Sequence, residues 1–332
     1  MQISKPPMPK YLKQDELTQE CKDLLSSLPT ESGWVASTFY KYQGFWHPCR
    51  HLQGILSCQK HFKAQHSDVI LATTPKSGTT WLKAILFALM NRDQYFSKSK
   101  NINNHPLKSN NPHVLVPFLE IKLYLDDENP DLSLLKSPRL FSTHMPYVSL
   151  PNSVHDSQCK LVYLCRNPKD TLISLWCFTN KLRLEEMGTS SLEEVFEKFC
   201  KGVSMYGPFW DHVLGYWGES LKNPEKVLFL KYEDMKEKPT FHLKKLAEFL
   251  ECPFSFKEEK EKVVEGILEL CSFDKLSNLK VNKDGKLPSG EDCSAFFRKG
   301  EVGDWKNYLT TEMVERLDKI CKDKFDGSGL QF

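Results

Sequence analysis

Residues 73–81 read Thr73-Thr74-Pro75-Lys76-Ser77-Gly78-Thr79-Thr80-Trp81 and connect two apolar runs. The run before them, residues 69–72 (Val-Ile-Leu-Ala), is typical of a buried strand. The run after them, residues 82–90, is apolar apart from Lys83, which indicates a buried helix. Residues 73–81 are therefore predicted to be the turn between a strand and a helix.

The composition of this turn is that of an anion-binding loop. Backbone N–H groups at the start of a helix point at an anion, and Lys76 adds a full positive charge. The standard P-loop pattern, G-x-x-x-x-G-K-S/T, is not met, because Lys76 precedes the only glycine, Gly78. The plain alternative is an ordinary turn with a surface lysine. We interpret the segment as a phosphate cradle of an unusual kind.

The overall composition limits the classes of partner. The chain has 332 residues, of which 40% are hydrophobic and 12% aromatic, enough for one large α/β domain or two small ones. A net charge of +2 does not suggest a nucleic-acid binder. The longest apolar runs fall short of the roughly 20 residues of a membrane span. We expect neither nucleic acid nor a membrane as a partner.

The cysteines and the first residues predict a cytoplasmic location. There are 11 cysteines, an odd number without a C-x-x-C pair, and the start of the chain lacks the features of a signal peptide. His47-Pro48-Cys49-Arg50-His51 groups metal-ligating side chains, but its spacing matches no common zinc pattern. No metal site is predicted.

Three further apolar runs predict buried strands, at residues 139–144, 160–165 and 226–231. Each ends at a polar or ionisable side chain, His144, Arg166 and Tyr232 in turn. Strands that alternate with helices favour a mostly parallel sheet flanked by helices. Because the carboxyl ends of such strands face one crevice, we expect these three residues to meet Lys76 there. For Arg166, the alternative is a surface arginine paired with Asp170.

The second half of the chain is predicted to be mainly helical. Residues 192–217 keep a helical period throughout, and three later helices are expected at residues 241–250, 258–270 and 311–322. Residues 271–304 are rich in loop residues, and a loop of this length is typical of a lid. Arg298-Lys299-Gly300 on this segment is a second candidate for anion binding.

Aromatic side chains are candidates for a pocket that takes a flat, apolar ligand. For most of them core packing is an equally good explanation. The candidates are Phe39, Trp46, Phe118, Phe178, Phe209, Trp210 and Phe273.

Three separate segments together resemble the cytosolic sulfotransferases. They are residues 74–81, Arg166-Asn167-Pro168-Lys169-Asp170, and Phe297-Arg298-Lys299-Gly300-x-x-Gly303-Asp304-Trp305. The resemblance runs from about residue 67 to the last helix. The N-terminal arm and residues 39–46 are most similar to the plant branch, which includes the flavonol sulfotransferases.

The resemblance implies a fold and a reaction. The fold would be a single α/β domain at residues 67–330, with a nucleotide-kinase-like topology and a phosphosulfate-binding loop. Residues 1–66 would supply an N-terminal arm and a substrate-pocket segment packed on it. The donor would be 3′-phosphoadenosine 5′-phosphosulfate (PAPS), leaving 3′-phosphoadenosine 5′-phosphate (PAP), and no metal is required. The acceptor would be a hydroxyl of a small, largely apolar molecule. A flavonoid or other phenolic is favoured, and steroid-like or hydroxylated hormones stay open.

The resemblance also implies roles for individual residues. His144 would be the general base, which suits a neutral histidine near pH 7. Lys76 would stabilise the leaving phosphate. The residues that would bind the donor are Lys76, Ser77, Gly78, Thr79, Thr80, Trp81, Arg166, Ser174, Tyr232, Arg298, Lys299 and Gly300.

Two departures from the family pattern and two alternative functions remain. Ser142 stands where many animal members have a lysine, so a charge that would support the transferring sulfonate is absent at this position. Thr311 replaces a valine of the family's dimer motif, so we expect a monomer or a weak homodimer. An ATP-dependent kinase is disfavoured because no strand end offers a clear aspartate for Mg²⁺. An inactive nucleotide-binding module would have no need of a base at His144.

Overall fold

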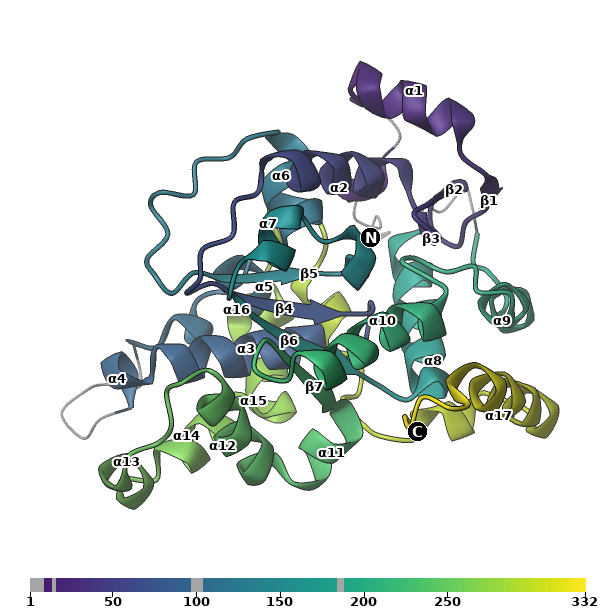
Figure 1. The fold of residues 1–332 in the computed structure, drawn as a ribbon. Coiled ribbons are helices and arrows are strands. Elements are labelled where there is room, and N and C mark those ends of the chain that lie inside the picture. Colours follow the sequence, from purple (N-terminus) through teal and green to yellow (C-terminus); the bar gives the residue numbers. More distant parts are fainter. Residues whose placement is uncertain (1–8, 14–15, 97–103, 184–187) are drawn as a thin grey trace.

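A four-stranded parallel sheet forms the centre of the fold (Figure 1). The computed structural model describes residues 9–13, 16–96, 104–183 and 188–332, so residues 1–8 and 14–15 of the expected arm lie outside it. The strand order is β5-β4-β6-β7, and every neighbouring pair is parallel. The strands are β4 (Val69–Thr73), β5 (Leu140–Thr143), β6 (Lys160–Cys165) and β7 (Val227–Lys231). The predicted single α/β domain with a parallel sheet flanked by helices is confirmed.

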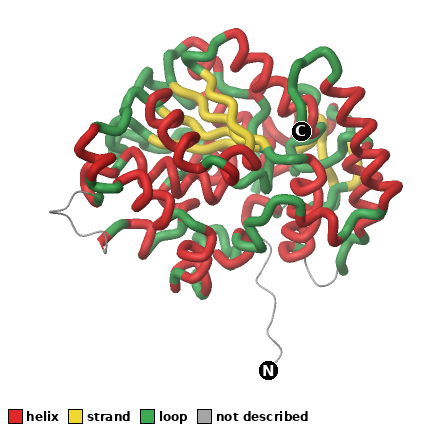
Figure 2. The backbone as a smooth tube through the Cα atoms, turned by 90° about the horizontal axis from the view of Figure 1, so that it is seen from below, coloured by secondary structure: helices red, strands yellow, loops and turns green. Residues whose placement is uncertain are grey.

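Alternate residues of each strand enter two separate hydrophobic cores. In β4, Ile70 and Ala72 pack into one core, whereas Val69 and Leu71 pack into the other. This period of two is the geometry of a strand covered on both faces. It explains why the strands read as continuous apolar runs. In Figure 2 the yellow strands lie enclosed by helices.

The helices cover both faces of the sheet. The first core includes side chains of α2 (Cys49–His61), α8 (Pro168–Leu182), α10 (Phe209–Lys222) and α17 (Thr311–Phe325). The second includes side chains of α3 (Thr79–Met90), α12 (Pro239–Phe249) and α14 (Val263–Leu270). The other α-helices are α1 (Gln19–Ser27), α4 (Arg92–Tyr95), α5 (Pro112–Leu115), α6 (Tyr124–Asp126), α7 (Asn152–Asp156), α9 (Leu192–Cys200), α11 (Tyr232–Glu237), α13 (Phe256–Lys260), α15 (Phe273–Asn278) and α16 (Lys280–Lys283).

Shorter helical turns complete the connections. Two of them matter for the site: a 3₁₀ turn at Lys10–Leu12 and a π-helical turn at Leu119–Leu123. The remaining 3₁₀ turns are Pro106–Lys108, Tyr147–Ser149, Cys293–Phe296 and Asp304–Asn307. No helix within the described ranges has the length and apolarity that crossing a membrane would take.

The aromatic stretch at residues 39–46 forms part of a small second sheet. Its strands β1 (Thr30–Ser32), β2 (Thr38–Tyr42) and β3 (Phe45–His47) are antiparallel. The two-residue turn at Gln43 and Gly44 has φ of +48° and +90°, as a hairpin turn of this length requires. The interpretation as a core strand pair is therefore the correct one for this segment.

The single helix expected at residues 192–217 is wrong, because the chain forms α9 and α10 with a turn between them. Gly202 has φ of +80°, and a Cβ there would lie 2.9 Å from the ring of Pro208. Pro208 cannot continue a helix from the preceding turn, so it starts α10 instead. The apolar period runs across this break, which is why the sequence does not reveal it.

Two other segments also differ from expectation. Residues 258–270 hold α13 and α14, separated at Lys262, whose φ is +57°. Residues 271–304 were expected to be mainly loop but contain α15, α16 and a 3₁₀ turn at Cys293–Phe296. Short helices of this kind lack the long apolar period that identifies a helix in a sequence.

Candidate active site

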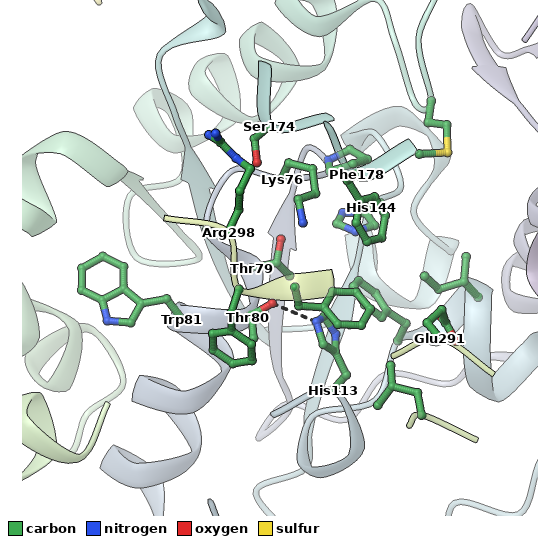
Figure 3. Close-up of a pocket in the computed structure, with 18 of the residues that line it drawn as sticks. Lys76, Thr79, Thr80, Trp81, His113, His144, Ser174, Phe178, Glu291 and Arg298 are labelled. Carbon is green, nitrogen blue, oxygen red and sulfur yellow. Dashed lines mark hydrogen bonds between the residues drawn. The ribbon is translucent and has the colours of Figure 1, made fainter. Parts of the chain in front are cut away.

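The carboxyl ends of all four parallel strands open into one cavity (Figure 3). Lys76 after β4, His144 after β5, Arg166 after β6 and Tyr232 after β7 all line it. The structure therefore places these four residues together, as the predicted topology requires. Ser174, Arg298, Lys299 and Gly300 line the same cavity.

The turn after β4 approaches the ring of Tyr232 very closely. Gly78 has φ of +102°, and a Cβ there would lie 2.6 Å from that ring, so only glycine fits. Helix α3 starts at Thr79, whose hydroxyl is 2.7 Å from the hydroxyl of Thr73. The side chain of Ser77 is buried against Thr74. The N-terminus of α3 is thus aimed into the cavity.

Positive charge is concentrated on one side of this cavity. The ammonium of Lys76 lies 4.0 Å from the ring centre of Phe178. Burial, together with the charges of Lys181, Arg298 and Arg166, lowers the pKa of Lys76 to about 7. Because a nearby anion favours the charged form of a lysine, this side of the cavity suits a ligand with negative charge.

The arginines keep hydrogen-bonding capacity for such a ligand. Arg166 lies 3.5 Å from Asp170, the alternative pairing considered above, and stacks on Tyr232 at 4.5 Å. Arg298 and Lys299 both pair with Asp304. The Nε atoms of Arg166 and Arg298 are buried and have no hydrogen-bond partner among the described residues. Unpaired buried donors at a cationic cluster fit a phosphate ligand.

The protonation state of His144 is fixed by the backbone. Its Nδ1 lies 2.8 Å from the carbonyl oxygen of Thr73, which can only accept, so Nδ1 carries the proton. The other nitrogen, Nε2, then holds a lone pair and bonds no other part of the described chain. Burial is the main cause that lowers the pKa of His144 to about 3, with the charges of Lys83 and Lys76 contributing. The ring is therefore neutral at physiological pH.

A buried glutamate supports His144 from behind. Glu120, on the π-helical turn Leu119–Leu123, accepts hydrogen bonds from the His144 backbone N–H at 2.7 Å, from the Thr143 hydroxyl at 2.9 Å and from the Tyr206 hydroxyl at 3.2 Å. Burial raises the pKa of Glu120, and these hydrogen bonds oppose the rise. The sequence analysis missed Glu120, since no motif or strand end marks it.

A second histidine links the loop to the pocket. His113 Nε2 lies 2.9 Å from the Thr80 hydroxyl, and its Nδ1 lies 3.0 Å from the Lys83 ammonium (Figure 3). The ring of His113 stacks on Phe118 at 5.5 Å, and Phe118 in turn lies 4.6 Å from His144. His113 and Lys83 were also missed, because Lys83 is a lone polar residue in an apolar run and no motif marks His113.

The structure divides the seven aromatic side chains predicted for the pocket into two groups. Of the seven aromatic candidates, Phe118, Phe178 and Phe273 line the cavity. The other four pack in the first hydrophobic core and do not line it: Phe39, Trp46, Phe209 and Trp210. A core aromatic and a pocket aromatic look the same in a sequence. Lining residues that were not anticipated include Tyr11, His51, Ile121, Met205, Tyr206, Glu291 and Phe296.

These features define a class of protein. A parallel sheet whose carboxyl edge carries an anion-binding loop, a cluster of cations and a neutral histidine is typical of an enzyme that transfers a group from a phosphorylated donor.

Comparison with known proteins identifies the family. The sequence profile of the sulfotransferase domain matches residues 66–329. Cytosolic sulfotransferase 12 of Arabidopsis thaliana is 52% identical over 98% of both chains, and cytosolic sulfotransferase 5 of the same plant is 52% identical over 97% of this chain and 99% of its own. The chain belongs to the sulfotransferase family, and its relatives confirm the predicted plant branch.

Solved structures agree with this assignment. A crystal structure of an Arabidopsis thaliana sulphotransferase superposes with a TM-score of 0.77, at 46% identity over 98% of this chain and 99% of the other. Mouse sulfotransferase SULT7A1, crystallised in complex with PAP, superposes with a TM-score of 0.66, at 29% identity over 87% of this chain and 95% of the other.

Proposed function

We propose that this enzyme transfers the sulfonate group of PAPS to a hydroxyl of a small, largely apolar acceptor, with His144 as the general base. Membership of the sulfotransferase family supports PAPS as the donor. The observation that carries the proposal is the placement of Lys76 and of the uncharged His144 in one cavity, with the lone pair of Nε2 free.

The cationic side of the cavity would hold the donor. Lys76, the N-terminus of α3 and the side chains of Thr79 and Thr80 would surround its phosphosulfate end. Arg166, Ser174 and the segment 298–300 would hold its 3′-phosphate. Tyr232 and Trp81, whose rings lie 5.4 Å apart and nearly perpendicular, would contact the adenine.

Two side chains would assist the reaction directly. PAPS supplies the sulfonate that the acceptor receives. His144 Nε2 takes the proton from the acceptor hydroxyl, and the Nδ1 hydrogen bond to Thr73 stabilises the ring in the required tautomer. Lys76 provides positive charge where the leaving phosphate becomes more negative.

The acceptor half of the cavity would favour a flat molecule. Phe118, Phe178 and Phe296 form its apolar wall next to His144 and Lys76. We favour a flavonoid or another phenolic, because rings of this kind pack well between aromatic side chains. Steroid-like acceptors satisfy the same apolar requirement.

A kinase is the second candidate, and a simple experiment separates the two. The thermal unfolding of the enzyme is compared with PAP and with ATP plus Mg²⁺. PAP is expected to raise the melting temperature more than ATP plus Mg²⁺, because at equal concentration the ligand with the lower Kd stabilises the folded protein more. A panel of phenols is then assayed with PAPS. A larger shift with ATP plus Mg²⁺, or no sulfonated product from any phenol, would count against the proposal.

Among the described residues that line the cavity, the only carboxylate is Glu291. It lies on the side of the cavity opposite Trp81 (Figure 3).

A further inference from the structure

The acceptor side of the cavity ends in three polar side chains from three distant segments. Tyr11 comes from the turn Lys10–Leu12, His51 from α2, and Glu291 from the loop before Cys293–Phe296. His51 and Glu291 are only 3% and 2% exposed. Figure 3 shows Glu291 on the His144 side of the cavity, away from Trp81 and Arg298. These groups therefore belong to the acceptor half rather than to the nucleotide half.

Two of the three side chains have unsatisfied polar atoms. Neither ring nitrogen of His51, nor Oε2 of Glu291, has a hydrogen-bond partner within the described ranges of the chain. A buried polar atom that is left unpaired destabilises the folded protein. Such a cost is tolerated where a ligand satisfies the atom, and both residues line the cavity.

Aromatic contacts hold His51 in place and leave its nitrogens available. Its ring stacks on Tyr206 at 5.4 Å and 29°, and it lies 5.5 Å from the ring of Tyr11. Burial is the first cause that raises the pKa of the Tyr11 phenol, followed by the charge of Glu291 nearby. The segments of Tyr11 and Glu291 are joined where the backbone N–H of Lys10 donates to the carbonyl oxygen of Ser289 at 3.3 Å, and both side chains line the same cavity. Tyr11 thus lies near both other members of the group, so His51 and Glu291 lie at one place in the cavity.

This place is separate from the reaction centre. The ring of Tyr206 contacts both His51 and His144, with ring centres 5.4 Å and 5.5 Å from theirs. A group that reaches His51 and Glu291 is therefore a second group of the acceptor, distinct from the hydroxyl that meets His144.

The chemistry of the two side chains selects the kind of group. Burial and the charges of His47 and His144 lower the pKa of His51 well below its usual range, so the neutral ring offers one donor and one acceptor. The Glu291 carboxylate only accepts. A hydroxyl can donate to Glu291 and accept from His51 at once. An ammonium cannot accept, and a carboxylate or sulfate cannot donate and would be repelled by Glu291.

We propose that Glu291 and His51, positioned by Tyr11, form a recognition site for a second hydroxyl at the far end of a neutral acceptor, and that they reject acceptors with an anion there. This inference rests on the proposed function and narrows its substrate class. Flavonoids and steroid-like diols fit, whereas hydroxylated hormones with a carboxylate at the far end do not.

A binding experiment tests the site without turnover. The PAP-loaded enzyme is titrated calorimetrically with 7,4′-dihydroxyflavone, 7-hydroxyflavone, 7-hydroxy-4′-methoxyflavone and 4′-carboxy-7-hydroxyflavone. The dihydroxy compound is expected to bind roughly tenfold tighter than the methoxy compound, which has no donor at that end. The carboxy compound is expected to bind weakest. Equal affinities for the hydroxy and methoxy compounds, or no binding of any of the four, would overturn the inference.

Variants identify the residues responsible. Glu291→Leu and His51→Phe are each expected to abolish the preference for the second hydroxyl, and Glu291→Gln to restore binding of the carboxy compound. Asp292→Asn is the matched control. This substitution also removes one negative charge, at the residue next to Glu291. The Asp292 carboxylate pairs with Lys286 at 3.6 Å and does not line the cavity. An unchanged preference in Glu291→Leu contradicts the proposal. If the leucine variant does not fold, Glu291→Gln decides: a carboxy compound that binds this variant as weakly as it binds the wild type contradicts the proposal, because the repelling charge is gone.

A parallel turnover assay keeps the two proposals distinguishable. Sulfonation of 7-hydroxyflavone by PAPS reports on the reaction alone, because this acceptor lacks the second hydroxyl. Sulfonation without any preference at the far end would refute the recognition site and leave the proposed function intact. A preference in binding without sulfonation of any flavone would refute the proposed function and leave the recognition site intact.

Discussion

Gly54 on α2 lies so close to the backbone of Glu120 that an added Cβ would come within 1.8 Å of the carbonyl oxygen. The contact joins α2 to the π-helical turn Leu119–Leu123, which is remote from it in sequence. The carboxylate of Glu120 on this turn accepts a hydrogen bond from the backbone N–H of His144. The position of His144 therefore depends on helix packing as well as on the end of β5.

A methyl group at Gly54 should disturb the site from a distance. We expect Gly54→Ala to lower the free energy of unfolding by roughly 1–3 kcal/mol, the usual cost of overpacking, and to reduce kcat because Glu120 must move. Thermal unfolding and steady-state kinetics measure the two effects. Gly218→Ala on α10 is the control, since nothing lies within 4 Å of its Cβ position. If Gly54→Ala behaved like the control, the packing argument would fail.

Loss of the general base should abolish turnover and leave nucleotide binding unchanged. We expect His144→Ala to lower kcat by roughly two to four orders of magnitude, while the Kd for PAP stays near that of the wild type. Rapid-quench turnover with PAPS and calorimetry with PAP give the two values. His242→Ala, on α12 and outside the cavity lining, should leave both unchanged. Normal turnover in His144→Ala would remove its assigned role.

Arg166 should distinguish nucleotides by their 3′-phosphate. Hydrogen bonds to a charged group contribute roughly 1.5–3 kcal/mol, so we expect Arg166→Ala to weaken the affinity for PAP by one to two orders of magnitude. The affinity for AMP, which lacks the 3′-phosphate, should fall far less. Competitive titration of both nucleotides against the variant measures the difference. Equal losses of affinity for PAP and AMP would show that Arg166 does not contact the 3′-phosphate.

Nucleotide binding should be coupled to protonation of Lys76. The pKa of Lys76 is lowered to about 7 from a usual value of 10.5, so the free enzyme loses this proton as the pH rises above 7. A bound phosphate raises the pKa again. PAP binding should therefore take up a proton between pH 7 and 10.5, and PAP affinity should fall as the pH rises through that window.

Calorimetry in buffers of different ionisation enthalpy counts the proton. Lys76→Arg should bind PAP without uptake, because arginine keeps its proton throughout this range. Without nucleotide, the unfolded chain binds the extra proton, so the free energy of unfolding should rise with pH over the same window. Proton uptake at pH 8 that persists in Lys76→Arg would assign the effect to another group.

The sheet and the residues at its strand ends were predictable because both follow from local patterns. A strand buried on both faces, such as β4 or β6, is an uninterrupted apolar run, and the residue where the run stops is at the carboxyl edge. His144 and Arg166 follow from this rule, and Lys76 follows from the composition of the turn after β4. The break at Pro208 did not follow, because the apolar period continues from α9 into α10.

The acceptor half was much less accessible to sequence analysis. Glu291 lies on a loop of this half, and Glu120, which supports His144 from behind, lies on a π-helical turn; no spacing marks a functional side chain in either place. Phe39 and Trp210 show the opposite error. Burial in the core satisfies an aromatic ring as fully as a ligand does, and only the three-dimensional packing separates the two cases.

The wall that contains Tyr11 and Glu291 brings together the two extremes of the chain, since the backbone N–H of Lys10 donates to the carbonyl oxygen of Ser289. During synthesis, the turn at Lys10–Leu12 leaves the ribosome long before its partner has been translated. The nascent chain can assemble β4, β5, β6 and β7 while this end of the cavity is still missing. A truncation past residue 12 would consequently remove Tyr11 from this wall and Leu12 from the first hydrophobic core.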